Sequence, residues 1–410
     1  MRCIAFIGLL VCFTWSVSAQ KRLQAELGVL DARHWNFHKD RLALSGYWKA
    51  IEGRLVDPQA VYTTPSADHF FPAVWNDVRN DGSGSGYVTY FLNVLVPDSI
   101  QSWAIEVPQV YSGFRLFVNE KEIGSAGTVS ENNVRPQWIV KTMRFELPQS
   151  DTLKLVLQIA NFHHHKGGIK HPVYLGTPEN LFNHRTAAYT SNGFEIVVIF
   201  LEGIVFVILA VMRRKRIILF FSLLCLTWTI RSMFSNLYAI TVLIPDFDWN
   251  WQVRIEYLTL YLTMIWAVLF LQELFSKIGS RKFSYTIVLV NVFFILFTLF
   301  SSPLMFTQWV SLYLAVAGVL VAYGGFLVIR AVFYEHAGAW FLLGSVMMGV
   351  ITFGYDIISY QTALSYNFVF LNIGYIVMFM LTAVAMLFHL NVLKDKKSNV
   401  LTYNDLFDKN

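Results

Sequence analysis

The chain has 410 residues, of which 55% are hydrophobic and only 14% are charged. Soluble proteins carry about 25% charged residues, so this composition argues against an ordinary soluble enzyme and predicts a membrane protein. The net charge of +5 is small, and much of the basic charge lies in short segments beside apolar stretches, which is a signal of membrane topology and excludes a nucleic-acid surface.

Residues 1–19 have the pattern of a cleaved signal peptide. Arg2 provides a positive start, an apolar core runs from Ile4 to Trp15, and small residues at the cleavage positions end at Ala19. The alternative is an uncleaved first anchor, which the short apolar core disfavours. After cleavage Cys225 remains as the single cysteine, so no intrachain disulfide can form, which suits a bacterial periplasm better than a eukaryotic cell surface.

A β domain is predicted next, at residues 40–185, after a lead-in of residues 20–39. Alternation of apolar and polar residues, as from Val88 to Val96, has the period of a half-buried strand. Further strands are expected around Phe114–Val118, Trp138–Phe145 and Leu153–Ile159. About eight strands with Gly and Pro at the joints predict an all-β, antiparallel sandwich or jelly-roll fold.

The second half of the chain carries long apolar stretches. A bilayer core needs about 20 apolar residues per helix, and backbone groups in lipid must bond within the segment. The sequence therefore predicts an α-helical seven-transmembrane bundle over residues 190–390, with helices near 190–212, 217–237, 252–272, 283–301, 307–329, 339–361 and 367–390.

Basic residues predict the orientation of the bundle, because they stay on the cytoplasmic side. They follow the first, third, fifth and seventh stretches, whereas the loop after the second carries Asp246 and Asp248. The β domain is therefore expected outside the cell, with the tail of residues 391–410 in the cytoplasm. The expected location is the bacterial inner membrane.

The order of several motifs in the β region carries a family resemblance. The motifs are Leu44-Ser45-Gly46-Tyr47-Trp48, Phe71-Pro72-Ala73-Val74-Trp75, Phe114-Arg115-Leu116-Phe117-Val118-Asn119 and Asn161-Phe162-His163-His164-His165, followed in the membrane half by Arg254-Ile255-Glu256-Tyr257. The chain resembles bacterial seven-transmembrane receptors with diverse intracellular signalling modules. Its outer domain is more distantly similar to the galactose-binding-like, sugar-binding domain of family 2 glycoside hydrolases.

The resemblance implies a sensor of an extracytoplasmic ligand, with carbohydrate as the presumed class, and transmission to a cytoplasmic kinase or cyclase. The chain departs from the family pattern after His389, because about 20 residues remain and these are too few to fold as an output domain. Signalling is therefore expected to pass through a separate partner protein. Membrane lipid is an expected contact, and a homodimer is left open.

A ligand site is predicted on the β domain from aromatic and planar polar side chains, which suit sugars and other polar ligands. The alternative for each of them is a structural role. The run His163-His164-His165 is not expected to hold a metal, since neighbouring residues on a strand point to opposite faces. No metal and no cofactor are expected, and the tentative ligand residues are Tyr111, Arg135, Trp138, Asn161, His163 and Lys166.

Charged residues within the apolar stretches are costly in lipid and are the second group of candidates. Acids and bases near the outer ends of the helices are expected to pair between helices and to couple the outer domain to the bundle. The expected coupling residues are Glu195, Arg231, Arg254, Glu256 and Asp356.

The sequence favours a receptor over two alternatives. A transporter would be expected to show internal repeats and broken helices, and the chain shows no repeat. A membrane-anchored carbohydrate-binding or hydrolytic protein is the other alternative, but the scattered acids of the β region offer no recognisable catalytic pair. The chain is therefore not expected to be an enzyme.

Overall fold

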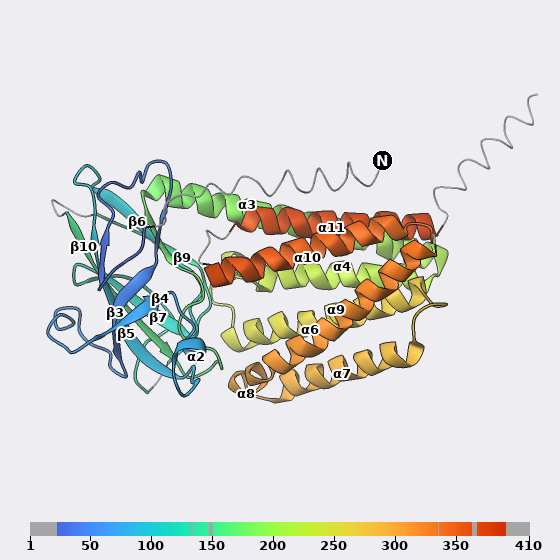
Figure 1. Ribbon diagram of the computed structural model, residues 1–410, viewed down its shortest axis with the longest axis horizontal. Helices are drawn as coiled ribbons and strands as arrows, with labels where there is room; N and C mark the ends of the chain where they lie inside the picture. Colours follow the sequence, from blue (N-terminus) through green and yellow to red (C-terminus); the bar gives the residue numbers. More distant parts are fainter. Residues whose placement is uncertain (1–22, 133, 147–150, 335, 363–366, 391–410) are drawn as a thin grey trace, which may run out of the picture.

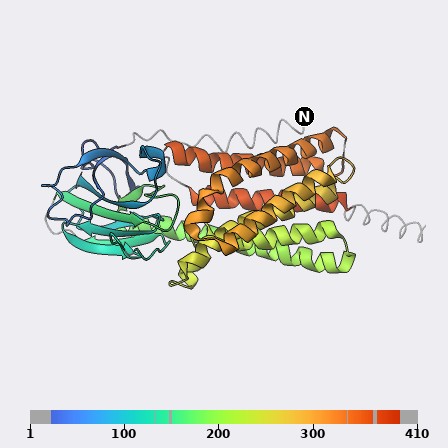
Figure 2. The same cartoon turned by 90° about the horizontal axis from the view of Figure 1, so that it is seen from below.

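A β domain and a bundle of helices lie end to end in the computed structural model, and the helices extend from one end of the β domain (Figures 1 and 2). The structure describes residues 23–132, 134–146, 151–334, 336–362 and 367–390, without the side chains of residues 356–362. The predicted signal peptide and the tail of residues 391–410 lie outside the described residues.

Two sheets build the β domain. The larger follows the order β4-β3-β5-β10-β7-β8, with β1 added in parallel to β5, and the smaller follows the order β2-β11-β6-β9. Strand β10 lies between β5 and β7, so strands distant in sequence are neighbours, as in a jelly roll. The bounds are β1 Val29–Asp31, β2 Leu42–Leu44, β3 Gly46–Glu52, β4 Ala67–Phe71, β5 Gly86–Leu95, β6 Ser102–Val107, β7 Gly113–Val118, β8 Lys121–Ala126, β9 Lys141–Glu146, β10 Thr152–Asn161 and β11 Val173–Gly176.

The main core lies between the two sheets. Side chains on a strand alternate between faces, and Val88, Leu92 and Val94 of β5 all point inward and are fully buried. From the smaller sheet, Trp103 and Ile105 of β6 enter the same core. Each large side chain buried here contributes roughly 1.5–3 kcal/mol relative to leaving it exposed.

The strands differ from the sequence prediction in two respects. The described residues hold eleven strands where about eight were expected, because β1, β2 and β11 have three or four residues and are too short to show alternation. Trp138 was expected in a strand, but β9 begins at Lys141, and Trp138 lies before it in a buried loop position.

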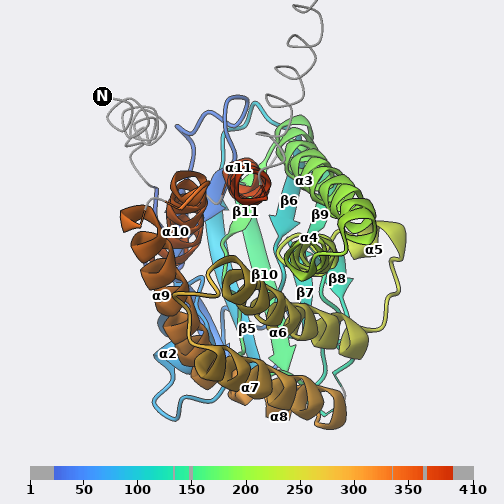
Figure 3. The same ribbon diagram turned by 90° about the vertical axis from the view of Figure 1, so that its right-hand side faces the viewer.

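Long helices form the second half. Six of them are long and apolar enough to cross a membrane, and α10 stands beside them with an apolar stretch over Ala339–Tyr355. Seen from the far end, the helices stand side by side over the sheets (Figure 3). The membrane helices are α3 Pro178–Arg213, α4 Arg216–Phe234, α6 Trp249–Leu274, α7 Arg281–Phe300, α9 Val310–Phe333, α10 Ala339–Thr362 and α11 Phe368–His389; the short helices are α2 Trp75–Val78, α5 Ile240–Leu243 and α8 Pro303–Gln308. An all-β domain followed by a helical membrane bundle confirms the predicted fold class.

Helix α3 begins 12 residues before the predicted span near residue 190. Thr177 caps it by accepting a hydrogen bond from the Asn180 backbone N–H, Pro178 occupies the first helical position, and Glu179 lies in the first turn. These start signals place the first turns of α3 against β6, β9 and β11. One continuous helix therefore joins the β domain to the bundle.

Candidate functional site

A single asparagine organises the loop that follows β10. The Asn161 side-chain amide donates to the carbonyls of Gly84, His164 and Lys166 at 2.7, 2.7 and 2.9 Å. Its carbonyl oxygen accepts from Ser112 Oγ and from the backbone N–H of His164. Asn161 is fully buried, so these bonds satisfy its polar atoms and the bonded backbone groups of the loop in place of water. Its position fixes where the three histidines point.

Aromatic side chains from this loop and its neighbours meet aromatic side chains at the ends of the helices. Trp138 lies 5.7 Å from Trp249 of α6 and 5.5 Å from Tyr238, measured between ring centroids. The His164 ring stacks on Tyr111 at 4.8 Å and meets Trp138 at 5.4 Å. We call this cluster the aromatic joint; it comprises Tyr111, Trp138 and His164 of the β domain and Tyr238, Trp249 and Phe306 of the bundle.

Two hydrogen bonds cross the aromatic joint. Gln252 of α6 donates from Nε2 to the Trp138 carbonyl at 3.2 Å, and the His165 backbone N–H donates to Thr307 Oγ1 of α8 at 3.0 Å. Gln252 is 1% exposed, so its bond lies in a dry environment. A buried bond of this kind is costly to leave unmade, and it therefore fixes the register between the loop and the helix.

His164 is neutral in the aromatic joint. Its Nδ1 accepts a hydrogen bond from the Lys166 backbone N–H at 3.0 Å, and the ring is 2% exposed. Burial disfavours the charged imidazolium and lowers the pKa of His164 to about 3. The same cause lowers the pKa of Lys166, and the nearby Lys170 adds to that effect. Protonation of His164 at low pH would therefore destabilise the packing of the aromatic joint.

The structure brings five of the six predicted ligand residues to this one region. Tyr111, Trp138 and Asn161 are buried in it, and the His163 ring lies 6.1 Å from Trp249. Lys166 belongs to the loop through its backbone bonds, as described above. Arg135 is separate, because it is exposed and its backbone pairs with Thr128 in a hairpin. Of the gathered residues, Trp138 and His163 meet the ring of Trp249 at the start of α6.

The histidine run divides between different neighbours. His164 faces Tyr111 and Trp138, while His163 faces Trp249. Across the described part of the chain, no three side chains of His, Cys, Asp or Glu come together as a metal site would require.

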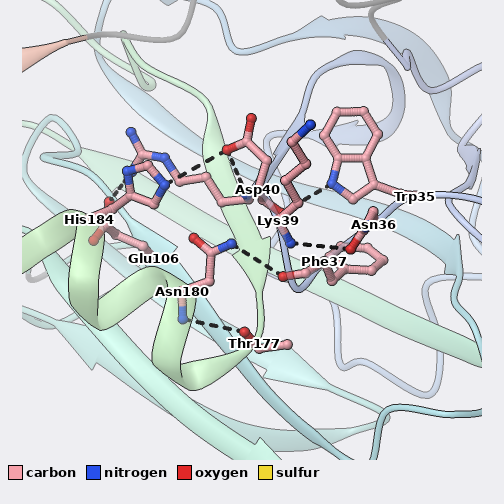
Figure 4. Close-up of polar contacts among 10 residues, drawn as sticks. Trp35, Asn36, Phe37, Lys39, Asp40, Glu106, Thr177, Asn180 and His184 are labelled. Carbon is pink, nitrogen blue, oxygen red and sulfur yellow. Dashed lines mark hydrogen bonds and ion pairs between the residues drawn. The ribbon is translucent and has the colours of Figure 1, made fainter.

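A second contact with the bundle lies at the start of α3 (Figure 4). Asn180 donates from Nδ2 to the carbonyl of Phe37, and His184 Nε2 lies 3.8 Å from Asp40 Oδ1. Beside them, Arg41 forms an ion pair with Glu106 of β6 at 3.2 Å, with both side chains about nine-tenths buried. We call this contact the polar anchor; it comprises Phe37, Asp40, Arg41, Glu106, Thr142, Asn180, His184 and Arg185.

Hydrogen bonds connect the polar anchor across strands β6 and β9 and helix α3. Glu106 Oε1 accepts from Arg41 and Glu106 Oε2 accepts from Thr142 Oγ1 of β9 at 3.1 Å. Thr142 Oγ1 in turn accepts from Arg185 Nη1 of α3 at 3.0 Å. The sheet and the helix therefore share one network of charged and polar groups.

The predicted coupling residues lie in the half of the bundle nearest the β domain, but the expected acid–base pairs are not among the ion pairs of the described residues. Arg231 of α4 donates to the backbone carbonyl of Glu256 at 2.9 Å. Arg254 of α6 donates to the carbonyls of Thr298 and Leu299. These two carbonyls lie in the last turn of α7, where no helical donor follows and the dipole is negative, so they compete with a carboxylate for the guanidinium.

Glu195 of α3 is bonded to neutral donors. It accepts from Trp228 Nε1 at 3.0 Å and from Ser232 Oγ at 2.5 Å, both on α4. It therefore links two helices without a cation. Asp356 lies in α10, and its side chain is outside the described part of the structure.

Sequence reasoning missed the helix side of the aromatic joint. Trp249 and Gln252 follow Asp246 and Asp248 at the start of the third span, and Tyr238 precedes these acids, in a region where aromatic residues are usual for the membrane interface. Because aromatic residues are common at this position in any membrane helix, the pattern did not indicate a contact with the β domain. The ordering by Asn161 was also missed, since its partners Gly84 and Ser112 lie 77 and 49 residues away in sequence.

Comparison with known protein families identifies the second half of the chain. Residues 189–391 match the model of the family described as 7TM diverse intracellular signalling. No curated protein sequence matches the chain.

Similar solved structures are family 2 glycoside hydrolases. A β-galacturonidase from Eisenbergiella tayi is 15% identical with a TM-score of 0.26, covering 35% of this chain and 26% of that enzyme. A β-glucuronidase of an uncultured Clostridium species is 18% identical with a TM-score of 0.27, covering 33% of this chain and 28% of that enzyme. The chain thus spans less than a third of either enzyme. Through residues 189–391 it belongs to the 7TM diverse intracellular signalling family of membrane receptors.

Proposed function

We propose that this receptor senses a ligand outside the cell with its β domain and passes the signal through the aromatic joint to its helices. A cytoplasmic protein of the kinase or cyclase type then responds. The observation that carries the proposal is the direct packing of Trp138 against Trp249 and Tyr238. A change in the β domain has to reach the bundle through contiguous contacts, and these are contiguous.

Orientation is the first part to test. The basic segment Arg213–Arg216 joins the end of α3 remote from the β domain to the start of α4, which supports a cytoplasmic location for that end. A reporter enzyme active only in the cytoplasm, fused after Asn410, should be active, and the same reporter fused within 82–86 should be inactive. Activity in the reverse pattern would overturn the proposal.

For the ligand we propose a carbohydrate. Trp138 and His163 meet the helix ends, Tyr111 packs in the same cluster, and Asn161 and Lys166 shape the loop beside them, so we assign these five to transmission and look for ligand contact elsewhere. Tyr47 of β3 and Phe70 of β4 expose 52% and 42% of their surface and form a ring pair with centroids 5.6 Å apart. The ion pair of Lys49 and Asp68, 2.9 Å apart, lies two residues further along the same two strands, on the same face of the sheet. Exposed rings beside polar groups are typical of sugar contact.

Glycan-array binding of the full chain in nanodiscs tests this assignment. Wild-type protein should bind a restricted set of glycans, and a variant with Tyr47→Ser and Phe70→Ser should lose that binding. A matched variant, Val78→Ser, changes an exposed apolar residue of α2 and should bind as wild type does. Absence of all glycan binding would remove the carbohydrate assignment and leave the receptor assignment standing.

For the partner, site-specific photo-crosslinking in cells is the direct test. A photoreactive residue at Lys215, in the basic segment after α3, should capture a kinase or cyclase. The same residue at Asp248, at the opposite end of the bundle, should not. Capture of such a protein from Asp248 instead would contradict the proposed direction of signalling.

A further inference from the structure

A polar cavity of about 90 Å³ lies between α3, α4 and α11, at the end of the bundle nearest the β domain. This is space for several water molecules inside a membrane helix bundle. Polar side chains supply much of its wall, whereas lipid-facing positions are apolar. Its lining includes Asn192, Glu195, Trp228, Arg231, Asn372 and Tyr375.

Glu195 provides an acidic group without a cation. It is 1% exposed, and the ion pairs of the described residues do not include it. Trp228 and Ser232 donate to Oε1, while Asn192 Nδ2 donates to Oε2 at 3.4 Å. A carboxylate oxygen accepts more than one hydrogen bond, so Oε2 retains capacity to accept another. An ionisable group at this depth is expensive unless it has a functional partner.

Asn192 provides a second acceptor. It is 5% exposed, it lines the cavity, and its Oδ1 is buried with no hydrogen-bond partner among the described residues. A buried carbonyl oxygen left in this way costs roughly 1–3 kcal/mol, which a donor in the cavity would recover. Two acceptors three residues apart on one helix face therefore line the same cavity.

Aromatic rings form another part of the wall. Trp228 lies 4.9 Å from Tyr375 and 6.5 Å from Phe353, and Phe353 lies 5.8 Å from Tyr375. The faces of such rings attract cations, and an aromatic enclosure beside a carboxylate is the usual arrangement for an ammonium group. The exposed Asn236 also lines the cavity, so its rim reaches the surface of the protein.

We propose that this cavity binds a small ammonium-bearing molecule, with Glu195 as its counter-charge, Asn192 Oδ1 as a hydrogen-bond acceptor and the three rings as its wall. Arg231 lines the same cavity and donates to the Glu256 carbonyl through Nη1. Its guanidinium is the group that would receive a carboxylate if the ligand is an amino acid. The site lies within the bundle and is independent of ligand binding by the β domain.

Calorimetric titration of the full chain in nanodiscs tests the proposal with three probes. Methylammonium carries the amine alone, glycine carries both charges, and acetate carries the carboxylate alone. We expect methylammonium or glycine to bind and Glu195→Gln to weaken that binding about 100-fold, since a charge-assisted contact is lost. Asn192→Ala should weaken it about tenfold, and this variant removes an unsatisfied buried oxygen, so it is expected to fold.

Glu202→Gln is the matched control. It makes the same change two turns further along α3, at a carboxyl group whose oxygens have no hydrogen-bond partner in the described structure, and it should bind as wild type does. Tighter binding of glycine than of methylammonium, with the difference removed by Arg231→Gln, would identify an amino acid; equal binding would identify a simple amine. Binding of none of the probes up to millimolar concentration, binding of acetate alone, or binding unchanged in both Glu195→Gln and Asn192→Ala would overturn the proposal.

Discussion

The β domain meets the bundle at two places of opposite chemistry. At the polar anchor, α3 continues directly from the sheet and is held by directional bonds such as those from Asn180 to Phe37 and from Arg185 to Thr142. At the aromatic joint, ring faces meet ring edges, and two hydrogen bonds accompany a large apolar contact.

The difference in chemistry indicates which of the two contacts can rearrange when a ligand binds. Directional bonds to a continuous helix hold one arrangement, because any displacement leaves buried charges unpaired. Ring contacts tolerate several offsets and tilts at similar energy. A ligand-driven tilt of the β domain would therefore pivot about α3 and repack Trp138 against α6, which is a two-state element of the kind that receptors use.

The largest expected effect breaks the aromatic joint. Trp249→Ala should lower the free energy of unfolding by about 3–5 kcal/mol, because a large side chain 4% exposed leaves a cavity. Trp251→Ala alters the same residue type two positions later, where the side chain is 53% exposed, and should cost less than about 1 kcal/mol. Denaturant unfolding of the full chain in detergent, followed by circular dichroism, measures both. Equal losses of unfolding free energy in the two variants would contradict the role of Trp249 in holding the aromatic joint together.

Breaking the polar anchor should have the next largest effect. Glu106→Gln leaves Arg41 almost buried without its counter-charge and should cost about 2–3 kcal/mol in the same unfolding measurement. Glu122→Gln disrupts the pair with Arg115, whose side chains are 37% and 40% exposed, and should cost less than about 1 kcal/mol. A larger loss for Glu122→Gln would contradict the account of the anchor.

Acid should weaken the aromatic joint specifically. The pKa of His164 is held at about 3 by burial against about 6.5 when unfolded, so between these values the unfolded chain binds a proton that the folded chain does not. Stability therefore falls as the pH drops below about 6.5. Between pH 7.5 and 5, wild type should lose about 2 kcal/mol more than His164→Phe, which keeps a ring against Tyr111 and cannot be charged. If the unfolding free energies of wild type and His164→Phe change with pH by the same amount, this role of His164 is refuted.

The smallest effect concerns the start of α3. Thr177→Ala removes the side chain that caps the helix at Asn180 and should cost about 1 kcal/mol. Hydrogen exchange should increase in the first turn of α3 and remain unchanged at Trp249. Faster exchange throughout the aromatic joint would show that the two contacts are not separable.

The fold was largely predictable because its signals are local. Alternation along residues 88–96 predicts a strand, and the apolar stretches predict helices, since each pattern depends on neighbours in sequence. The Thr177-Pro178 start of α3 was visible too, but the apolar stretch begins later and set the expected boundary. The strands of three or four residues are formed by pairing across the sheets, which no local pattern records.

The candidate site was predictable in composition but not in arrangement. Aromatic and polar residues at 111, 138 and 161–166 do come together, yet their neighbours are Trp249 and Tyr238, more than 70 residues later in the chain. The choice between a ligand and a helix end as the partner of Trp138 depends on how the domains pack. The expected acid–base pairs are absent from the ion pairs of the described residues for a related reason: Arg254 donates to backbone carbonyls at the end of α7, and a list of charged residues does not include such acceptors.

A double-mutant cycle between Trp138 and Trp249 tests most directly whether the β domain and the bundle are energetically coupled. Unfolding free energies of wild type, Trp138→Ala, Trp249→Ala and the double variant give the coupling, and a cycle between Trp103 and Trp249 provides a pair without contact. The account predicts a coupling of about 1 kcal/mol or more for Trp138 with Trp249 and near zero for the control pair. Additive losses for Trp138 and Trp249 would contradict the claim that this joint transmits a signal.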